Sequence, residues 1–208
     1  MEKDKKNGIP AWLQKDYVPV SVDIERAYEQ DLIKYGRALP EGFIDTKVLA
    51  KYDEILINFE EYEFLGILLG PIIVSKGGKW GLTRLDGEEI LPCKYEKVLP
   101  RTHYDFGVKQ NGKWGVFNPS GKKWDLHCSH DMIYCNRPSP IGLIVYSDKG
   151  KFGWTGCQFS ENNIKAEYDI VYLPCKEYFY SDQYGDEIES FVAVKDGKID
   201  FYEYWTCK

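Results

Sequence analysis

A four-residue phrase that recurs four times constrains this chain more than any other feature of its sequence. Its copies read Gly-Lys-Trp-Gly, Gly-Lys-Trp-Gly, Gly-Lys-Phe-Gly and Gly-Lys-Ile-Asp, at residues 78–81, 112–115, 150–153 and 197–200. Regular recurrence of this kind is typical of repeat proteins, in which each copy marks one supersecondary unit. The chain is therefore predicted to contain four similar units.

Each copy of the phrase follows an apolar run and overlaps a turn dipeptide. These dipeptides are Gly77-Gly78, Asn111-Gly112, Lys149-Gly150 and Asp196-Gly197. Asn-Gly and Asp-Gly tolerate the positive φ that both central residues of a type I′ turn require. The four units are therefore predicted to be β-hairpins.

Apolar residues alternate in the strand that follows each turn. The alternating pairs are Trp80/Leu82, Trp114/Val116, Phe152/Trp154 and Ile199/Phe201. Residues two apart lie on one face of a strand, so these pairs are predicted to face the core. Gly81, Gly115 or Gly153 separates the first three pairs, and a glycine inside a strand is unfavourable unless another backbone lies close to it. Tight backbone packing is therefore predicted at these glycines.

A second phrase, centred on tyrosine or histidine, accompanies the hairpins. It reads Ala-Lys-Tyr-Asp, Cys-Lys-Tyr-Glu, Cys-Ser-His-Asp and Ala-Glu-Tyr-Asp, at residues 50–53, 93–96, 128–131 and 166–169. The spacing from each hairpin phrase to the next tyrosine phrase is nearly constant, whereas the spacing from a tyrosine phrase to the next hairpin varies. Insertions are therefore predicted in one class of connection, which in repeat proteins usually lies on one face.

The two phrases together resemble the WG repeat, also called the KWG repeat, of bacterial proteins. The resemblance rests on Gly-Lys-Trp-Gly and on Pro-Cys-Lys-Tyr-Glu-Lys-Val at 92–98, and it extends over about residues 48–202. It implies an all-β array of short strands with an interaction role, and it offers no catalytic residues. The chain departs from the pattern, as terminal or divergent units do, at His130, Phe152, Ile199 and Asp200.

The predicted fold is an all-β array of β-hairpin or three-stranded repeats over residues 48–208. The array begins with a tyrosine phrase and ends with a hairpin, so its ends can complete each other in a small propeller-like ring, although an open superhelix fits equally well. Residues 1–47 are predicted to form a capping segment with one helix. Residues 21–23 offer N-cap side chains, and Gly36 can end the helix. The predicted helix carries Ile24, Ala27, Tyr28, Leu32 and Tyr35.

Composition limits the partners and the compartment. The chain has 27 basic and 33 acidic residues and a net charge of -6, which argues against nucleic acid or an anionic membrane as the main partner and favours a protein with a basic surface. The N-terminal residues lead into no signal-peptide core, and no apolar run reaches the length of a membrane helix. A cytoplasmic protein is therefore expected, with its six cysteines as free thiols.

Two residue patterns suggest a metal site or a phosphate site, but structural roles explain them better. His127, Cys128, His130 and Cys135 are possible zinc ligands, but in the tyrosine phrases Cys128 occupies the place of an alanine or cysteine and His130 that of a tyrosine. These places predict a small buried side chain and an amphipathic ring, so no metal is expected. Residues 107–113 match a phosphate-loop pattern that Trp114 then breaks. No cofactor is predicted.

One acidic residue recurs in each tyrosine phrase. It is Asp53, Glu96, Asp131 or Asp169. An acid that returns once per unit is better explained as an acceptor for turn N–H groups, or as a solvated residue, than as a general acid. The chain is therefore predicted not to be an enzyme.

The longest insertion, residues 172–190, combines aromatic rings with carboxylates and is the predicted binding surface, together with a similar segment at 59–64. Rings surrounded by carboxylates can anchor and steer a basic protein partner, and an immunity or inhibitor protein is one such case. Two alternatives remain, namely rings that pack inward beneath an acidic loop and a glycan or cell-wall binding protein. The candidate binding residues are Glu61, Tyr62, Tyr178, Tyr180, Asp182, Tyr184, Asp186, Glu187 and Glu189.

Overall fold

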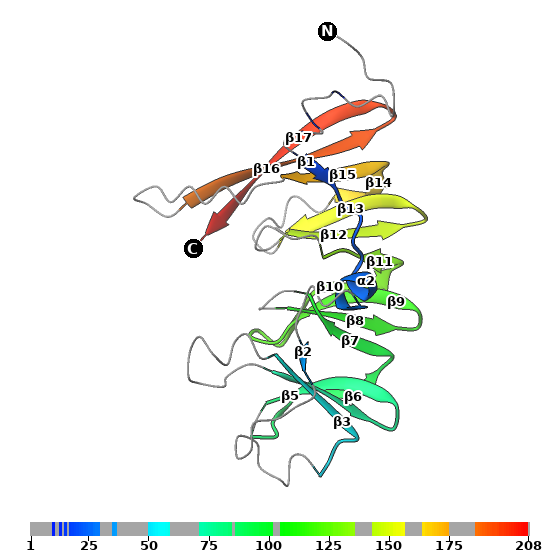
Figure 1. Ribbon diagram of the computed structural model, residues 1–208, viewed down its shortest axis with the longest axis vertical. Coiled ribbons are helices and arrows are strands. Elements are labelled where there is room, and N and C mark those ends of the chain that lie inside the picture. Colours follow the sequence, from blue (N-terminus) through cyan, green and yellow to red (C-terminus); the bar gives the residue numbers. More distant parts are fainter. Residues whose placement is uncertain are drawn as a thin grey trace. The chain divides into compact units, whose positions relative to one another are not determined.

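The computed structural model of the chain describes residues 10, 13, 15, 17–29, 35–36, 50–58, 71–84, 86–101, 105–135, 143–156, 164–174 and 186–207 (Figure 1). Strands dominate this part of the chain, and α2 (Ile24–Glu29) is a short helix. The prediction of an all-β protein is therefore confirmed.

The strands form four small antiparallel sheets. The first has the order β2-β3-β4-β5-β6, with β2 at Tyr35–Gly36, β3 at Glu54–Asn58, β4 at Ile72–Lys76, β5 at Lys79–Thr83 and β6 at Glu89–Tyr95. The second has the order β10-β9-β8-β7, with β7 at Lys97–Pro100, β8 at Phe106–Gln110, β9 at Lys113–Asn118 and β10 at Lys123–His130. β11 (Met132–Ile133) follows it in the chain.

The third sheet contains β12 (Leu143–Asp148), β13 (Lys151–Gly156) and β14 (Ile164–Tyr168). The fourth has the order β1-β15-β16-β17, with β1 at Tyr17–Pro19, β15 at Ile170–Pro174, β16 at Asp186–Lys195 and β17 at Lys198–Cys207. Its first strand comes from the N-terminal part of the chain, and the other three are consecutive.

The chain divides into two compact units. The C-terminal unit comprises Met1–Asp23 and Tyr134–Lys208, and the central unit comprises Ile24–Ile133. This division differs from a boundary at residue 47, because β1 pairs with β15 and the backbone N–H of Val20 donates to the carbonyl of Val171, whereas α2 contacts β7. The N-terminal segment therefore contributes to both units.

The four hairpin turns have the predicted type I′ conformation. Both central residues of each turn have positive φ, between 49° and 77°. The flanking strands pair in register as the hairpins β4–β5, β8–β9, β12–β13 and β16–β17. Type I′ turns match the right-handed twist of the strands that they join, so the prediction of four hairpins is confirmed.

The strand glycines lie directly beneath the backbone of the next strand. A Cβ atom on Gly115 would be 2.5 Å from the carbonyl oxygen of Leu126, and one on Gly153 would be 2.6 Å from that of Ile164; Gly81 meets Leu91 in the same way. Carbon and oxygen atoms in ordinary contact lie more than 3 Å apart. The predicted close approach of a second backbone is therefore confirmed.

The small residue of the tyrosine phrase lies in this same contact. The Sγ atom of Cys128 donates a hydrogen bond to the carbonyl oxygen of Val108 at 3.3 Å, and Val108 pairs with Gly115. Cys93 approaches the carbonyl of Val74 in the equivalent way, at 3.8 Å. Because the thiol reaches the carbonyl group of the hairpin below, a small residue suits this place. Both thiols are half-buried rather than fully buried.

We expect Gly115→Ala to lower the free energy of unfolding by about 1–3 kcal/mol, because the new methyl group meets backbone atoms that cannot turn aside. Gly107→Ala is the matched control. Its methyl group would meet the Cδ1 atoms of Ile24 and Ile133, which are the mobile ends of side chains. Urea unfolding of both variants measures the difference, and an equal or smaller loss for Gly115→Ala would contradict this account of the strand glycines.

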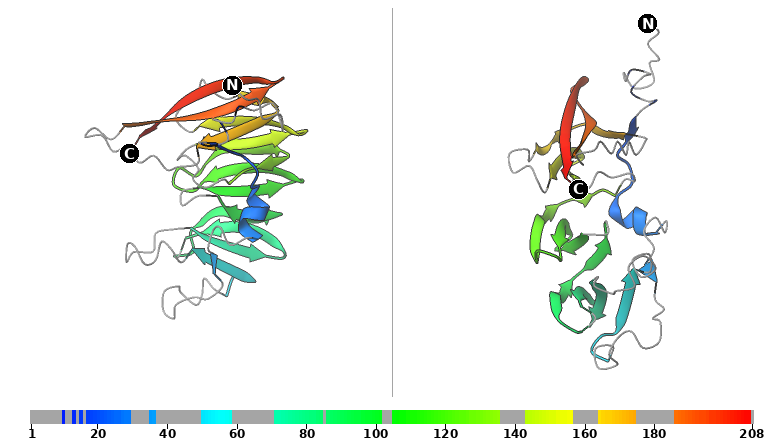
Figure 2. Two further views of the ribbon diagram at one scale, coloured as in Figure 1. Left: turned by 45° about the horizontal axis from the view of Figure 1, so that its top comes forward. Right: turned by 90° about the vertical axis from the view of Figure 1, so that its left-hand side faces the viewer.

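The core of the central unit is formed by residues from both of its sheets, whose strands are drawn in Figure 2. It includes Leu56, Ile73, Leu82, Leu91 and Tyr95 from the first sheet and Val98, Phe106, Val108 and Phe117 from the second. Each sheet thus presents one apolar face to the next, as the alternation in the sequence predicts.

The second residue of each alternating pair is buried in the first three hairpins but not in the fourth, and among the first residues only Trp114 is fully buried. Leu82, Val116 and Trp154 are buried, whereas the side chain of Phe201 is 57% exposed, so its predicted core position is wrong. Leu82 and Trp154 pair with Leu91 and Ile164 of a following strand. Within the described residues the order of the fourth sheet ends at β17, so no equivalent strand covers that position.

The predicted N-terminal helix is shorter than the apolar pattern suggests. α2 ends at Glu29, and Tyr35 and Gly36 form β2, which pairs with Asn58 and Ile57. The predicted helix end at Gly36 is therefore wrong, and residues 30–34 lie outside the described residues. Pairing with β3 supplies partners for the backbone groups of β2, which a local pattern does not reveal. Ile24 and Ala27 are fully buried.

Candidate functional site

Antiparallel connectivity gives each sheet two different ends. The turn end carries the four type I′ turns, and the loop end carries the connections that lead into the hairpins, such as β3–β4, β7–β8 and β15–β16. Residues 59–71, 101–105 and 175–185 make these connections in the first, second and fourth sheets. The variable spacings of the sequence fall here, as predicted. The loop end of each unit is therefore the candidate functional site.

Most of the predicted binding residues lie outside the described residues. These are Glu61, Tyr62, Tyr178, Tyr180, Asp182 and Tyr184. Asp186, Glu187 and Glu189 are described in their backbone, which belongs to β16 and pairs with Cys207, Thr206 and Tyr204 of β17.

The insertion is shorter than the sequence suggests. The insertion predicted over residues 172–190 is wrong from Asp186 onward, where the chain is a strand. Tyr172, at the start of the predicted surface, is buried in β15. The connection between β15 and β16 therefore consists of residues 175–185.

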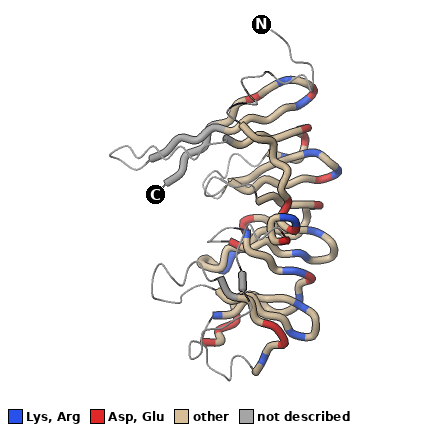
Figure 3. Tube along the Cα trace, viewed as in Figure 1, with Lys and Arg blue, Asp and Glu red and all other residues tan. Residues whose placement is uncertain are grey.

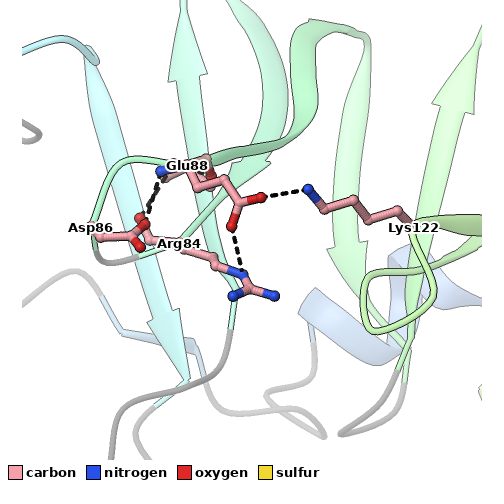
Figure 4. A network of polar contacts seen from close by, with 5 residues as sticks. Arg84, Asp86, Glu88 and Lys122 are labelled. Carbon is pink, nitrogen blue, oxygen red and sulfur yellow. Dashed lines mark hydrogen bonds and ion pairs between the residues drawn. The ribbon is translucent and has the colours of Figure 1, made fainter.

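A charged network occupies the described loop end of the central unit (Figure 4). Glu88 pairs with Arg84 at 3.2 Å and with Lys122 at 2.5 Å, and its backbone N–H donates to Asp86 at 2.9 Å. The hydrogen bond from Lys122 lowers the pKa of the Glu88 carboxyl, with further contributions from the charges of Lys122 and Arg84. Because these side chains are about half exposed, the pairs contribute little stability. The ion pair between Glu88 and Lys122 connects the β5–β6 turn with the β9–β10 turn.

A buried ion pair lies at the base of the β7–β8 connection. Arg101 Nε donates to Asp105 Oδ1 at 2.9 Å, and its Nη2 donates to Oδ2. The backbone N–H of Arg101 also donates to the carbonyl of Asp105 at 3.1 Å. The guanidinium and carboxylate thus meet in the bidentate geometry that gives strong, oriented pairing. This clamp was not predicted, because its only signal in the sequence is a pair of opposite charges four residues apart between two strands.

Three of the recurring acids, Asp53, Glu96 and Asp169, accept hydrogen bonds from the turns, as predicted. Asp53 accepts from the N–H of Gly77 at 2.7 Å, Glu96 from that of Gly112 at 3.1 Å, and Asp169 from that of Asp196 at 2.9 Å. Asp131 pairs with Lys113, and Asp169 with Lys151. Lysines and acids therefore alternate along the turn end of each unit (Figure 3). The acids act as structural acceptors.

We expect Asp169→Asn to lower the melting temperature at neutral pH and to have progressively less effect in acid. The hydrogen bond from Lys151, followed by that from the N–H of Asp196, lowers the pKa of Asp169 below 3.8. A carboxyl with a lowered pKa in the folded state stabilises the fold above its unfolded pKa, and this stabilisation disappears as the pH falls through the folded value. Melting curves from pH 7 to pH 2 measure the convergence, and a gap that stays constant with pH would contradict it.

The residues of the predicted zinc-like cluster have other contacts. The ring of His127 stacks on that of Trp124, with the ring centroids 5.9 Å apart, and His130 pairs with Trp114 across β9 and β10. Burial raises the pKa of the Cys128 thiol to about 11, so the thiol is protonated at neutral pH and is a poor nucleophile and metal ligand. Among the described residues no group of three His, Cys, Asp or Glu side chains is placed to hold a metal ion.

The aromatic rings of the C-terminal unit pack against one another. Trp154 contacts Tyr168, Phe191 and Tyr202, with ring centroids 4.7–5.0 Å apart. The hydroxyl groups of Tyr168 and Tyr202 are hydrogen-bonded to each other, and burial raises the pKa of Tyr202. These rings therefore form core contacts, and none of them is a stacking platform for a sugar.

No family model matches the chain, and neither a curated protein nor a solved structure matches it. The likeness to the WG repeat therefore rests on the residues quoted above. In the described part of the chain, no helix has the length and apolar character that crossing a membrane requires.

Proposed function

We propose that this chain is a non-catalytic, cytoplasmic protein-binding module built from WG-type β-hairpin repeats. The repeat assignment is supported by equivalent contacts in three sheets, where a strand glycine lies beneath the carbonyl group of the next strand. It is also supported by the three acids that accept hydrogen bonds from hairpin turns. These contacts assign the recurring residues to structure, which leaves the variable connections for recognition.

The observation that carries this proposal is the position of the long insertions. Residues 59–71 and 175–185 make the same topological connection in two sheets, at the end opposite to the type I′ turns. In repeat proteins, insertions that collect on one face often form the binding face. Both segments contain aromatic residues and carboxylates, which suit a basic protein partner. An immunity or inhibitor protein that covers such a partner is the biological role that we favour.

The N-terminal segment has a capping role in this proposal. Leu13 is fully buried and packs with Tyr172, Val192 and Val194 on one face of the fourth sheet, where Tyr17 also contacts them. An exposed apolar sheet face promotes aggregation. Covering it with residues from outside the array keeps the last unit in solution without a further repeat.

The proposed function is tested by affinity capture from bacterial cytosol, followed by binding measurements on the captured protein. We expect a stoichiometric partner with a basic surface. Tyr180→Ala and Tyr184→Ala should each weaken binding more than tenfold, about 2 kcal/mol, without changing the melting temperature. Lys79→Ala is the control, because Lys79 is exposed at the turn end. Equal effects of the loop-end and turn-end variants, or equal loss of folding and binding, would count against the proposal.

The glycan or cell-wall alternative predicts a different result. It requires exposed rings, whereas Trp154, Tyr168 and Phe191 are buried. A hit on a glycan array that Tyr180→Ala abolishes, together with no captured protein, would favour that alternative.

A further inference from the structure

The strand that follows each of the first three hairpins makes one specific contact with that hairpin. β6, β10 and β14 each bulge over the third residue of the preceding strand, which is Gly81, Gly115 or Gly153. At all three positions a Cβ atom would meet the carbonyl oxygen of one residue, the carbonyl carbon of the next and the backbone nitrogen of the one after that, all within 2.9 Å. A following strand that bulges in this way therefore requires glycine beneath it.

Asp200 occupies this same position in the last hairpin. It pairs with Ala193 of β16, as Gly81 pairs with Val74 of β4 and Gly115 with Val108 of β8. In each case the residue is the third of its strand, counted from the turn. The side chain of Asp200 is exposed, and the described order of the sheet ends at β17.

We propose that Asp200 closes the outer edge of β17 to a bulged strand from a second copy of this chain. This inference goes beyond the proposed function, because it concerns self-association rather than recognition of a partner. Its evidence is the coincidence of the glycine requirement in three sheets with the aspartate in the fourth.

Two physical effects of the aspartate act in the same direction. Its Cβ atom would overlap the backbone of an incoming strand, as the contacts of the three glycines indicate. Its carboxylate would also lose water beneath that strand, which is unfavourable for a charge without a partner. Open strand edges template the addition of further strands, and charged residues on the edge are a common means of preventing it.

The test uses a fluorescent peptide with the sequence of residues 163–169, which contains β14. In that strand Ala166 lies over Gly153, and Ile164 and Tyr168 pair with Trp154 and Phe152. Fluorescence anisotropy measures the binding of this peptide to the wild-type chain and to its Asp200→Gly and Asp200→Ala variants. Melting curves establish that each variant is folded, and a peptide with Ala166→Leu is the control for the bulged geometry.

We expect Asp200→Gly to bind the peptide at least tenfold more tightly than the wild-type chain, and Asp200→Ala to resemble the wild type because it keeps the Cβ atom. The control peptide should bind none of the three. Equal binding by all three proteins would overturn the proposal, and so would binding by Asp200→Ala as tight as that by Asp200→Gly. Failure of the folded Asp200→Gly variant to bind would also overturn it, because something other than the side chain would then close the edge.

Discussion

Trp114→Ala is expected to lower the free energy of unfolding by about 3–5 kcal/mol, the range for removing a buried tryptophan side chain. Trp114 is fully buried in β9, and Lys109 lies over its ring with Nζ 5.2 Å from the centroid. Trp80→Ala should cost less, because Trp80 is only half-buried. This corrects the sequence-based expectation that the two tryptophans occupy equivalent buried places. Trp80, in the first sheet, is only partly buried against the core between the two sheets. Trp114, in the second sheet, is fully buried.

Urea unfolding of the two alanine variants measures this difference. Trp114→Phe is the third variant, because the indole Nε1 of Trp114 is a buried polar atom for which the described residues provide no hydrogen-bond acceptor. Phenylalanine keeps an aromatic ring and removes that N–H group. Trp114→Phe should therefore lower the free energy of unfolding much less than Trp114→Ala does. A larger loss for Trp80→Ala than for Trp114→Ala would contradict the burial described here.

Asp105→Asn is expected to destabilise the fold by about 3–5 kcal/mol, because it removes the carboxylate that pairs with the buried guanidinium of Arg101. The side chain of Arg101 is 1% exposed, and both of its nitrogens in the pair donate to the carboxylate. An amide offers one acceptor oxygen where the carboxylate offers two, and it brings no charge.

The double variant Arg101→Met, Asp105→Asn separates the charge effect from a general loss of packing. It should be more stable than Asp105→Asn alone, because the buried charge of Arg101 is removed together with that of Asp105. A double-mutant cycle in urea gives the coupling energy. If the effects of the two substitutions simply add, Arg101 and Asp105 do not act as a clamp on the β7–β8 connection.

The hairpins were predictable because their determinants are local. A turn dipeptide such as Asn111-Gly112 favours the positive φ values of a type I′ turn, and the alternation of apolar residues after it indicates which face of the strand is buried. The contact beneath Gly115 was also predictable, because an unfavourable residue in a strand implies a compensating neighbour. The acids were predictable for a different reason, since recurrence in every unit favours a role that every unit shares.

The features that escaped prediction depend on residues distant in the chain or on tertiary contacts. The pattern through Tyr35 fits a helix, and only pairing with β3 makes residues 35 and 36 a strand. Asp186, Glu187 and Glu189 have the composition of a loop, yet the long register between β16 and β17 includes them. The pairing of Arg101 with Asp105 becomes informative only once both side chains are known to be buried.

The two hydrogen-bonding partners of Asp169 imply cooperativity between neighbouring hairpins of the C-terminal unit. Its carboxylate receives Lys151 from the β12–β13 hairpin and the N–H of Asp196 from the β16–β17 hairpin. Unfolding either hairpin therefore removes a contact that orients the carboxylate for the other. The energy of such an array resides partly in the interfaces between units, so an isolated hairpin is less stable than the same hairpin beside its neighbour. Unfolding of one of these hairpins is therefore expected to destabilise the neighbouring hairpin as well.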